Sequence, residues 1–232
     1  MISIIIPTYN EENYIKATIE SLWKKGGHDL VYEIIVADGG STDGTAKAAA
    51  SQGLTPVISP AKGRSAQMNY AALKAKGEIL YFLHADTLPP DGFTYDIVTA
   101  IKEGYEAGCY MLSFDYNHWF LKANCWFTRF DVNTFRFGDQ SLFVTKEAFD
   151  KAGGFCEKHI VLEDQDIIKR LKKTGRFKVI KKSVVTSARK YLENGIYKTQ
   201  GIFLLIWLMY RFGFSQQKLV RTYRNLIRQD KL

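Results

Sequence analysis

Apolar residues in the first 85 positions follow two alternating patterns. In residues 2–6, 33–37 and 79–83 they are nearly consecutive, which is typical of strands buried on both faces, and residues 56–59 predict a weaker strand. In the intervening segments apolar residues recur three or four positions apart, which predicts helices over residues 42–52 and 65–76. A further helix is expected to be capped by Asn10 and to end at Gly26. This alternation predicts an α/β fold with a parallel sheet and right-handed crossovers.

Polar residues follow three of these predicted strands, at the edge where a parallel sheet binds its ligands. They are Pro7-Thr8-Tyr9-Asn10-Glu11, Asp38-Gly39-Gly40 and His84-Ala85-Asp86. Between them, Lys62-Gly63-Arg64-Ser65 opens a predicted helix and combines cations with backbone N–H groups that could face an anion. Carboxylates could bind a ribose, a base or a divalent metal, and an arginine could clamp phosphates. The set suits a nucleoside diphosphate, although Asp-Gly-Gly alone is equally typical of a turn.

Composition sets the broad class. The chain has 232 residues, of which 46% are hydrophobic, which suits one large domain or one domain with a terminal appendage. Three scattered cysteines predict neither a disulfide framework nor a cysteine metal site, and they favour a reducing, cytoplasmic compartment. The N-terminus lacks the features of a secretory signal, and no apolar stretch is long enough to span a bilayer.

Charge divides the chain into an acidic body and a basic C-terminal third. Residues 1–164 carry a net charge of −6, residues 165–197 carry +8, and residues 198–232 carry +6. A basic region of this kind could face phosphates, a membrane surface or nucleic acid, or it could be a solvated helix face. We therefore expect one domain over residues 1–197 and a helical extension over residues 198–232.

The extension itself has two possible environments. Residues 202–210 are apolar on every side, so that a helix there would be buried or would contact lipid. Further on, one helical face carries Leu219, Val220, Tyr223, Leu226 and Ile227, and the other carries Lys218, Arg221, Arg224 and Arg228. Such a basic amphipathic helix either places residues 202–231 on an anionic membrane, which would make the protein peripheral on the inner face, or packs back on its own domain.

Two segments resemble the opening of family 2 glycosyltransferases, whose nucleotide-sugar-binding fold is called GT-A. They are Ser-Ile-Ile-Ile-Pro-Thr-Tyr-Asn-Glu-Glu at residues 3–12 and Ile-Ile-Val-Ala-Asp-Gly-Gly-Ser-Thr-Asp-Gly-Thr at residues 34–45. Phe-Leu-His-Ala-Asp-Thr at residues 82–87 lies where that family carries its Asp-x-Asp metal motif, and Leu-Glu-Asp-Gln at 162–165 resembles its catalytic motif. Together with Thr-Ser-Ala-Arg at 186–189, the pattern is most similar to the bacterial radical-SAM/selenodomain-associated transferase subfamily.

The resemblance implies a mostly parallel central sheet flanked by helices, with a nucleotide-binding half at 1–107 and an acceptor half at 108–197. It implies an inverting transfer from a nucleoside-diphosphate sugar to a hydroxylated, lipid-linked or other acceptor. The implied catalytic residues are Asp164 as the general base, Glu163 and, beside the diphosphate, Arg189. The implied nucleotide contacts are Thr8, Tyr9, Glu11, Asp38, Gly39, Arg64, Asn69 and Ala85, and the implied acceptor contacts are Gly138, Asp139 and Gln140.

The resemblance also implies that Asp86 binds Mg²⁺ or Mn²⁺ together with the diphosphate. The sequence departs from the family at His84, because a neutral imidazole is a poorer ligand than a carboxylate for a hard cation. His84 could equally pack or contact the nucleotide. Glu163 and Asp164 have two readings as well, since adjacent carboxylates at a helix start also complement the helix dipole. The apolar residues 160–162 before them favour a desolvated base.

Two other functions remain open on sequence alone. A sugar-phosphate nucleotidyltransferase would need a glycine-rich, basic loop after the first strand, where this chain has Pro7-Thr8-Tyr9-Asn10-Glu11. A non-enzymatic module that binds anionic surfaces through the basic third would leave the strand-end carboxylates without a role. Ten aromatic residues between positions 110 and 137 suit either a core or an acceptor groove. We expect no nucleic-acid partner.

Overall fold

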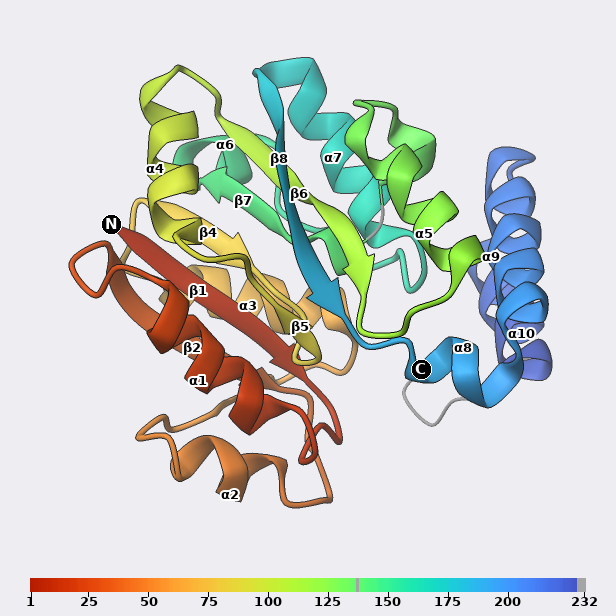
Figure 1. The fold of residues 1–232 in the computed structure, drawn as a ribbon, viewed down its shortest axis with the longest axis horizontal. Helices are drawn as coiled ribbons and strands as arrows, with labels where there is room; N and C mark the ends of the chain where they lie inside the picture. Colours follow the sequence, from red (N-terminus) through yellow and green to blue (C-terminus); the bar gives the residue numbers. More distant parts are fainter. Residues whose placement is uncertain (137, 229–232) are drawn as a thin grey trace.

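An eight-stranded sheet forms the centre of the computed structural model, which describes residues 1–136 and 138–228 (Figure 1). Its strands lie in the order β3-β2-β1-β4-β7-β6-β8-β5. Their bounds are β1 Ile2–Thr8, β2 Val31–Asp38, β3 Val57–Ile58, β4 Ile79–Phe82, β5 Thr87–Leu88, β6 Ala107–Phe114, β7 Leu142–Thr145 and β8 Phe177–Thr186. The flanking helices are α1 Ile15–Lys25, α2 Thr45–Ala50, α3 Arg64–Lys74, α4 Phe93–Lys102, α5 Trp119–Trp126, α6 Lys146–Lys151, α7 Glu163–Thr174, α8 Arg189–Asn194, α9 Ile196–Arg211 and α10 Gln216–Leu226. Short 3-10 turns lie at η1 Phe127–Arg129, η2 Asn133–Phe135 and η3 Gly138–Gln140.

Strand directions confirm a mostly parallel α/β sheet. β1 lies parallel to β2 and β4, β2 to β3, and β6 to β8, whereas β7 and β5 pair antiparallel with their neighbours. The parallel strands β1, β2, β3 and β4 are those expected in the first 85 residues. Because Thr8 pairs with Asp38 and Ile5 with Phe82, the carboxyl ends of β1, β2 and β4 meet at one edge. This edge carries the polar loops singled out in the sequence.

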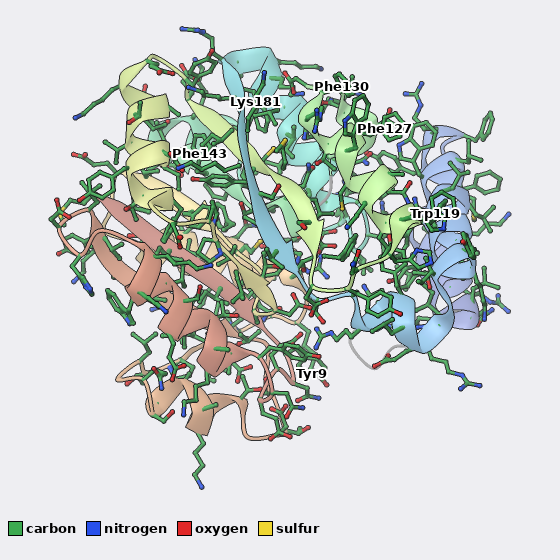
Figure 2. The ribbon with its side chains drawn as sticks, in the orientation of Figure 1. Tyr9, Trp119, Phe127, Phe130, Phe143 and Lys181 are labelled. Atoms are coloured by element: carbon green, nitrogen blue, oxygen red, sulfur yellow. The ribbon has the colours of Figure 1, made fainter. Side chains whose placement is uncertain are left out.

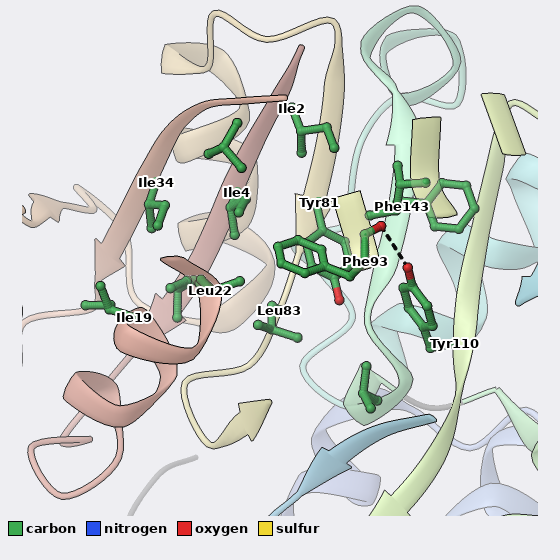
Figure 3. Close-up of a cluster of buried hydrophobic side chains, with 14 of the residues drawn as sticks. Ile2, Ile4, Ile19, Leu22, Ile34, Tyr81, Leu83, Phe93, Tyr110 and Phe143 are labelled. Atoms are coloured by element: carbon green, nitrogen blue, oxygen red, sulfur yellow. Dashed lines mark hydrogen bonds between the residues drawn. The ribbon is translucent and has the colours of Figure 1, made fainter. Parts of the chain in front are cut away.

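Two apolar layers, one on each face of the sheet, explain the consecutive apolar runs. Ile4 of β1 lies in the cluster beneath α1 and α4, and its neighbour Ile5 lies in the cluster beneath α3, α6 and α7. Successive side chains of a strand point to opposite faces, so a strand covered on both sides needs apolar residues at every position. Figure 3 shows the first cluster, in which the Tyr110 hydroxyl donates to the Phe93 carbonyl at 3.0 Å.

Asn10 does not cap α1, contrary to the sequence-based expectation. The helix begins at Ile15, its N-cap residue is Tyr14, and no side chain caps it. Asn10 instead adopts a left-handed φ of 54°, its N–H donates to the Ser41 hydroxyl, and its Oδ1 accepts from the Thr42 N–H. An asparagine side chain that bonds backbone groups tolerates this conformation well, so Asn10 joins the loops after β1 and β2.

The helix expected over residues 42–52 is also shorter than its pattern suggested. α2 begins at Thr45 because the Asp43 carboxylate accepts the Thr45 N–H at 3.0 Å and its hydroxyl at 2.5 Å. Residues 42–44 therefore remain in the loop that borders the ligand edge. The three cysteines are free thiols, as the sequence predicts.

The C-terminal helices form a hairpin that packs on the domain. Ile202 and Ile206 of α9 meet Leu219 and Tyr223 of α10 and Ile227 just beyond it, and this small core also contacts Val161 and Leu162. The apolar face of α10 is therefore buried in the protein, the second of the two environments considered above. The predicted start of the extension at residue 198 falls inside α9, and residues 229–231 of its proposed membrane segment lie outside the described residues. Within residues 1–136 and 138–228, no helix has the length and apolar character needed to cross a membrane.

Close strand packing in the sheet generates a stability prediction. A Cβ at Gly108 of β6 would lie 2.3 Å from Cζ of Phe143 and 2.4 Å from the carbonyl oxygen of Lys178. We expect Gly108→Ala to lower the free energy of unfolding by about 1–3 kcal/mol, because the strands must move apart. Gly201 is the matched control, since a Cβ there meets nothing within 4 Å. Gly201→Ala lies within α9 and should raise stability by about 0.5–1 kcal/mol. Urea unfolding of both variants measures the difference, and equal midpoints would contradict the packing argument.

Candidate active site

A cavity of about 1290 Å³ opens at the carboxyl edge of β1, β2 and β4. One wall comes from the loops after these strands and from the start of α3, and the opposite wall comes from α8, α9 and the end of α10. Its lining includes most of the residues predicted to form the site, namely Thr8, Tyr9, Glu11, Gly39, Arg64, His84, Ala85, Asp86, Asp139 and Arg189. The structure thus gathers residues that are far apart in the sequence around one space.

Hydrogen bonds to backbone groups hold the floor of the cavity together. The buried Gln67 of α3 donates through Nε2 to the carbonyls of Thr8 at 2.7 Å and Ala37 at 2.8 Å, which ties β1 to β2 at their ends. Gly39 allows this approach, because a Cβ there would lie 3.0 Å from Gln67 Nε2. Asp38 is buried beside them and accepts from the N–H and hydroxyl of Ser41. Sequence reasoning missed Gln67, whose position on the inner face of a helix was the only available signal.

Arg189 lies between two carboxylates on the β1 and β4 sides of the cavity. Its guanidinium forms a bidentate pair with Glu11, at 2.9 and 2.8 Å, and its Nη2 lies 2.8 Å from Oδ2 of Asp86. The guanidinium carbon lies over the Tyr14 ring, 4.4 Å from the ring centre. Burial raises the pKa of Asp86, and the Arg189 charge opposes this rise. Both oxygens of Glu11, predicted as a nucleotide contact, are therefore engaged by Arg189.

His84 pairs with Asp139 from the acceptor-side turn η3. The His84 Nδ1 lies 3.0 Å from Oδ1 of Asp139. Although burial and the Arg64 cation act in the opposite direction, the Asp139 carboxylate raises the pKa of His84. Burial likewise opposes ionisation of Asp139, but its hydrogen bond to His84 and the His84 charge hold the pKa of Asp139 well below its usual range. The Nδ1 of His84 is therefore engaged by Asp139.

Glu163 and Asp164 begin α7 and face different partners. Leu162 before them adopts a left-handed φ of 61°, and Glu163 is buried with its Oε1 accepting from Nη1 of Arg64 at 3.0 Å. Burial and the neighbouring Glu163 charge raise the pKa of Asp164 to about 7, although His84 and Arg64 act against the rise. A carboxylate with a pKa near neutrality can accept a proton and release it again under physiological conditions.

Three predicted residues have other surroundings than expected. Asn69 does not line the cavity; its amide bonds both backbone groups of Phe155 at 2.9 Å and so secures the turn before α7. Gln140 is buried, and its Oε1 accepts from the fully buried Arg136 at 3.4 Å. Gly138 begins η3 and follows residue 137, which lies outside the described residues. The Asn69 amide is held by a residue 86 positions away, which local sequence does not reveal, whereas Gln140 is bonded by Arg136 only four positions before it.

The far wall of the cavity is basic. The sequence indicated this only through the net positive charge of residues 165–232. Lys190, Lys198, Arg224 and Arg228 line it, and Phe203 supplies an apolar surface. The Asn194 Oδ1 accepts the Arg228 N–H at 2.8 Å and so fixes the end of α10 against α8. This contact explains how residues near the C-terminus reach a cavity built from the first strands.

The residues at the cavity fit a divalent cation whose remaining ligands are substrate phosphates and water. In the part of the chain that the structure describes, no cluster of three His, Cys, Asp or Glu side chains could hold a metal alone. Asp86 nevertheless presents a carboxylate to the cavity with a side chain that is mostly buried. Mg²⁺ in particular is often held by one or two carboxylates plus substrate phosphates and water. The donor set therefore suits a cation bound together with a diphosphate.

Comparisons with known proteins agree with the fold. The profile described as Glycosyl transferase family 2 matches residues 3–155. The chain is 30% identical over 98 residues to glucosyl-3-phosphoglycerate synthase of Mycolicibacterium smegmatis, covering 39% of this chain and 32% of that protein. It is 28% identical over 193 residues to chondroitin synthase of Pasteurella multocida, covering 78% of this chain and 20% of that protein. The chain thus spans about a third or less of these curated relatives.

Solved structures of the GT-A kind share this architecture. The mannosyltransferase PcManGT from Pyrobaculum calidifontis, in complex with GDP-Man and Mn²⁺, superposes with a TM-score of 0.72 at 19% identity, covering 97% of this chain and 67% of that one. TarS from S. aureus in complex with UDP gives a TM-score of 0.66 at 20% identity, covering 80% of this chain and 60% of that one. Identities this low establish the fold alone.

The position of Arg189 between two carboxylates generates an electrostatic prediction. We expect Arg189→Met to raise the pKa of Asp86 further, because the opposing cation is lost while burial remains. Stability should fall by about 1–3 kcal/mol, less than for a fully buried ion pair because the Arg189 side chain is 25% exposed. Carbon-13 NMR titration of Asp86 and urea unfolding measure the two effects. The exposed Arg129→Met is the control, and an unchanged Asp86 pKa in Arg189→Met would contradict the pairing.

Proposed function

The chain belongs to glycosyl transferase family 2, and from this membership we propose that it transfers a sugar from a nucleoside-diphosphate sugar to a hydroxyl group, with inversion at the anomeric carbon. One observation carries the proposal. Asp164, a carboxylate with a pKa near neutrality, is not itself a lining residue of the cavity, but it interacts with His84, Arg64 and Asp139, which line the cavity together with Asp86 and Arg189. A proton acceptor and a site for a leaving diphosphate are the two elements that such a displacement needs.

The donor would occupy the cavity from the nucleoside to the diphosphate. Thr8, Tyr9 and Gly39 line the part formed by the ends of β1 and β2, where we place the base and ribose, beside the buried Asp38. We place the diphosphate between Arg64 and Arg189, near Ala85 and Asp86. Asp86 would hold Mg²⁺ or Mn²⁺, which neutralises diphosphate charge when it is bound. GDP-Man with Mn²⁺ and UDP, each bound to one of the two similar structures, support this donor class without fixing the base.

Residues of the chain can be assigned to the acceptor proton and to the charge of the leaving diphosphate. Asp164 would take the proton of the acceptor hydroxyl as its oxygen attacks the anomeric carbon and the bond from that carbon to the diphosphate oxygen breaks. Arg189 would stabilise the charge that develops on the departing diphosphate. Glu163 is a positioning residue, because its contact with Arg64 fixes the start of α7 against the start of α3. A single displacement of this kind inverts the anomeric configuration.

The acceptor would bind on the side of η3 and the far wall. Asp139, held by His84, faces the cavity, and we place an acceptor hydroxyl near it. We propose a lipid-linked acceptor met at the cytoplasmic face of a membrane, because the basic residues of α8–α10 border the same cavity. Within the family, the segments at 162–165 and 186–189 support the radical-SAM/selenodomain-associated subfamily.

The alternative functions have less support. The match to the family covers residues 3–155, which is the acidic body and not the basic C-terminal third. A module that only bound anionic surfaces would not need the carboxylates that converge on this cavity. The loop after β1 contains no glycine, which disfavours nucleotidyl transfer. Release of a nucleoside diphosphate rather than pyrophosphate would distinguish sugar transfer from that reaction.

Asp164 generates a prediction on rate and pH. We expect Asp164→Asn to lower kcat about 10²–10⁴-fold while nucleotide binding is kept, because an amide cannot accept the proton. In the unsubstituted protein kcat/KM should rise with pH through about 7 and then level off, since the base must be deprotonated. Steady-state release of the nucleoside diphosphate, followed from about pH 5.5 to about pH 9 so that the range spans the transition, measures the profile.

Asp150 provides the control for this experiment, because it is exposed on α6, whereas Asp164 is half-buried and interacts with His84, Arg64 and Asp139. Asp150→Asn should keep the rate and the pH profile of the unsubstituted protein. A near-full rate in Asp164→Asn would show that Asp164 is not the base, and the role would pass to another carboxylate. Loss of nucleotide binding in the same variant would instead indicate a structural role.

Asp86 generates a prediction on donor binding. We expect UDP or GDP to bind with Mn²⁺ present and to bind more weakly without it, because Asp86 and the diphosphate share the ion. Asp86→Ala should remove the dependence on Mn²⁺, whereas Asp150→Ala should leave it unchanged. Calorimetric titration of both nucleotides with and without Mn²⁺ tests this and identifies the preferred base. Metal-independent binding of equal strength in the unsubstituted protein and in Asp86→Ala would overturn the metal assignment.

A further inference from the structure

The start of α7, which carries the proposed base Asp164, has an apolar residue at its N-cap. The helix begins at Glu163, and its N-cap residue is Leu162, whose side chain cannot accept a hydrogen bond from the first turn. Leu162 also has a left-handed φ of 61°, a conformation that is costly for a residue with a bulky side chain. Such a conformation persists where the surrounding structure fixes the backbone. The start of α7 therefore depends on contacts with other parts of the chain.

Gln216, the first residue of α10, bonds the backbone just before this helix start. Its Oε1 accepts the N–H of Ile160 at 3.1 Å and the N–H of Val161 at 3.2 Å. Its Nε2 donates to the Val161 carbonyl at 3.3 Å. One side-chain amide thus satisfies both backbone groups of Val161 and one of Ile160, as a neighbouring strand would do. These contacts fix the loop at 160–161 relative to α10.

Gln216 is held in place by the packing of its own helix. Leu219 and Tyr223 lie about one and two turns further along α10, and both are buried in the core that α10 shares with α9. α9 in turn lies beside α5, the helix that carries Trp119 in Figure 2. The hairpin is therefore fixed by the rest of the domain, and the Gln216 amide reaches the loop from a rigid element.

The loop that Gln216 bonds also forms part of the cavity wall. Its residues His159 and Ile160 line the cavity. On the side of α3, Nη1 of Arg64 donates to Oε1 of Glu163 at 3.0 Å, so that the start of α7 is held from α3 as well as from α10. Loss of the contacts from α10 would leave one of these two supports and would let the start of α7 move relative to the cavity.

We propose that Gln216 is a positioning residue for Asp164: by bonding the backbone at 160–161 it holds the start of α7, and with it the proposed base, in place beside the cavity. Gln216 acts through this loop and is not itself a catalytic residue. The inference rests on the proposed function in that Asp164 is the base there. It assigns a role in the reaction to α10, which lies beyond the residues 3–155 that match the family.

The protonation of Asp164 reports its position. Burial and the Glu163 charge raise the pKa of Asp164 to about 7. Asp139 adds to the rise, whereas His84 and Arg64 oppose it. If the start of α7 moved toward water, Asp164 would lose part of its burial and its pKa would fall toward the ordinary range of aspartate. A lower overall stability without such a movement would leave the pKa of the folded molecules unchanged.

The variant Gln216→Met of the full chain tests the proposal, because methionine has a similar length and helix propensity but no amide. We expect kcat to fall about 10- to 100-fold, since a small displacement of a catalytic group is costly for the rate. KM for the nucleotide sugar should stay unchanged. The titration midpoint of Asp164 should fall by about one pH unit. Steady-state release of UDP or GDP from the nucleotide sugar measures the rates, and carbon-13 NMR measures the midpoint.

Gln217 supplies the matched control, because it is the next residue of the same helix and its side chain is exposed. Gln217→Met should keep the kcat and the Asp164 midpoint of the unsubstituted protein. Gln216→Glu is the conservative variant, since it keeps an oxygen for the two N–H groups and loses only the bond to the Val161 carbonyl. It should therefore lose much less of kcat than Gln216→Met.

An unchanged kcat and Asp164 midpoint in Gln216→Met, or equal changes in Gln217→Met, would overturn the proposal. Loss of nucleotide binding in Gln216→Met would show a purely structural role and would overturn it as well. The NMR titration separates this proposal from the proposed function, because it requires no turnover. A lower Asp164 midpoint in Gln216→Met, in a chain that releases no nucleoside diphosphate, would support the positioning and contradict sugar transfer.

Discussion

The cation of Arg189, held between Glu11 and Asp86, joins the two halves of the site. Arg189 and Glu11 are 178 residues apart in the chain, and their bidentate contact fixes the start of α8 against the loop after β1. α8 leads directly into α9, with Gly195 between them, so the contact also places the C-terminal hairpin. Without a cation at this point, two largely buried carboxylates would face one another, which is costly in a medium of low polarity. The cavity and its far wall both depend on this arrangement.

Three aspartates around the cavity differ because their partners differ. Asp139 is stabilised in its charged form by His84, whereas Asp164 lies beside the like charge of Glu163 and is driven toward its neutral form. Asp86 lies between these cases, since burial raises its pKa and Arg189 opposes the rise. Groups whose environments separate their pKa values can take separate chemical roles. The proposed sugar transfer assigns Asp139 to the acceptor, Asp164 to the proton and Asp86 to the diphosphate and its cation.

The C-terminal hairpin serves the fold and the site at once. Its inner side packs on Val161 and Leu162, immediately before Glu163 and Asp164, and so supports the start of α7. Gln216 of α10 adds hydrogen bonds, since its Oε1 accepts the N–H groups of Ile160 and Val161 at 3.1 and 3.2 Å.

Local sequence determined the strands of the first 85 residues, the helices between them and the ligand edge, because buried strands need apolar residues at every position and loops at their ends need polar ones. The motif positions of Asp86, Arg64 and Asp164 followed from the family resemblance, and the structure brings them to one site. Only the tertiary structure decided the pairing of Arg189 with Glu11, the support from Gln67 and the position of Asn69 away from the cavity. It also decided which side of the basic hairpin is covered. These features are contacts between segments distant in the chain, and an amphipathic pattern shows that a face is apolar without showing what packs against it.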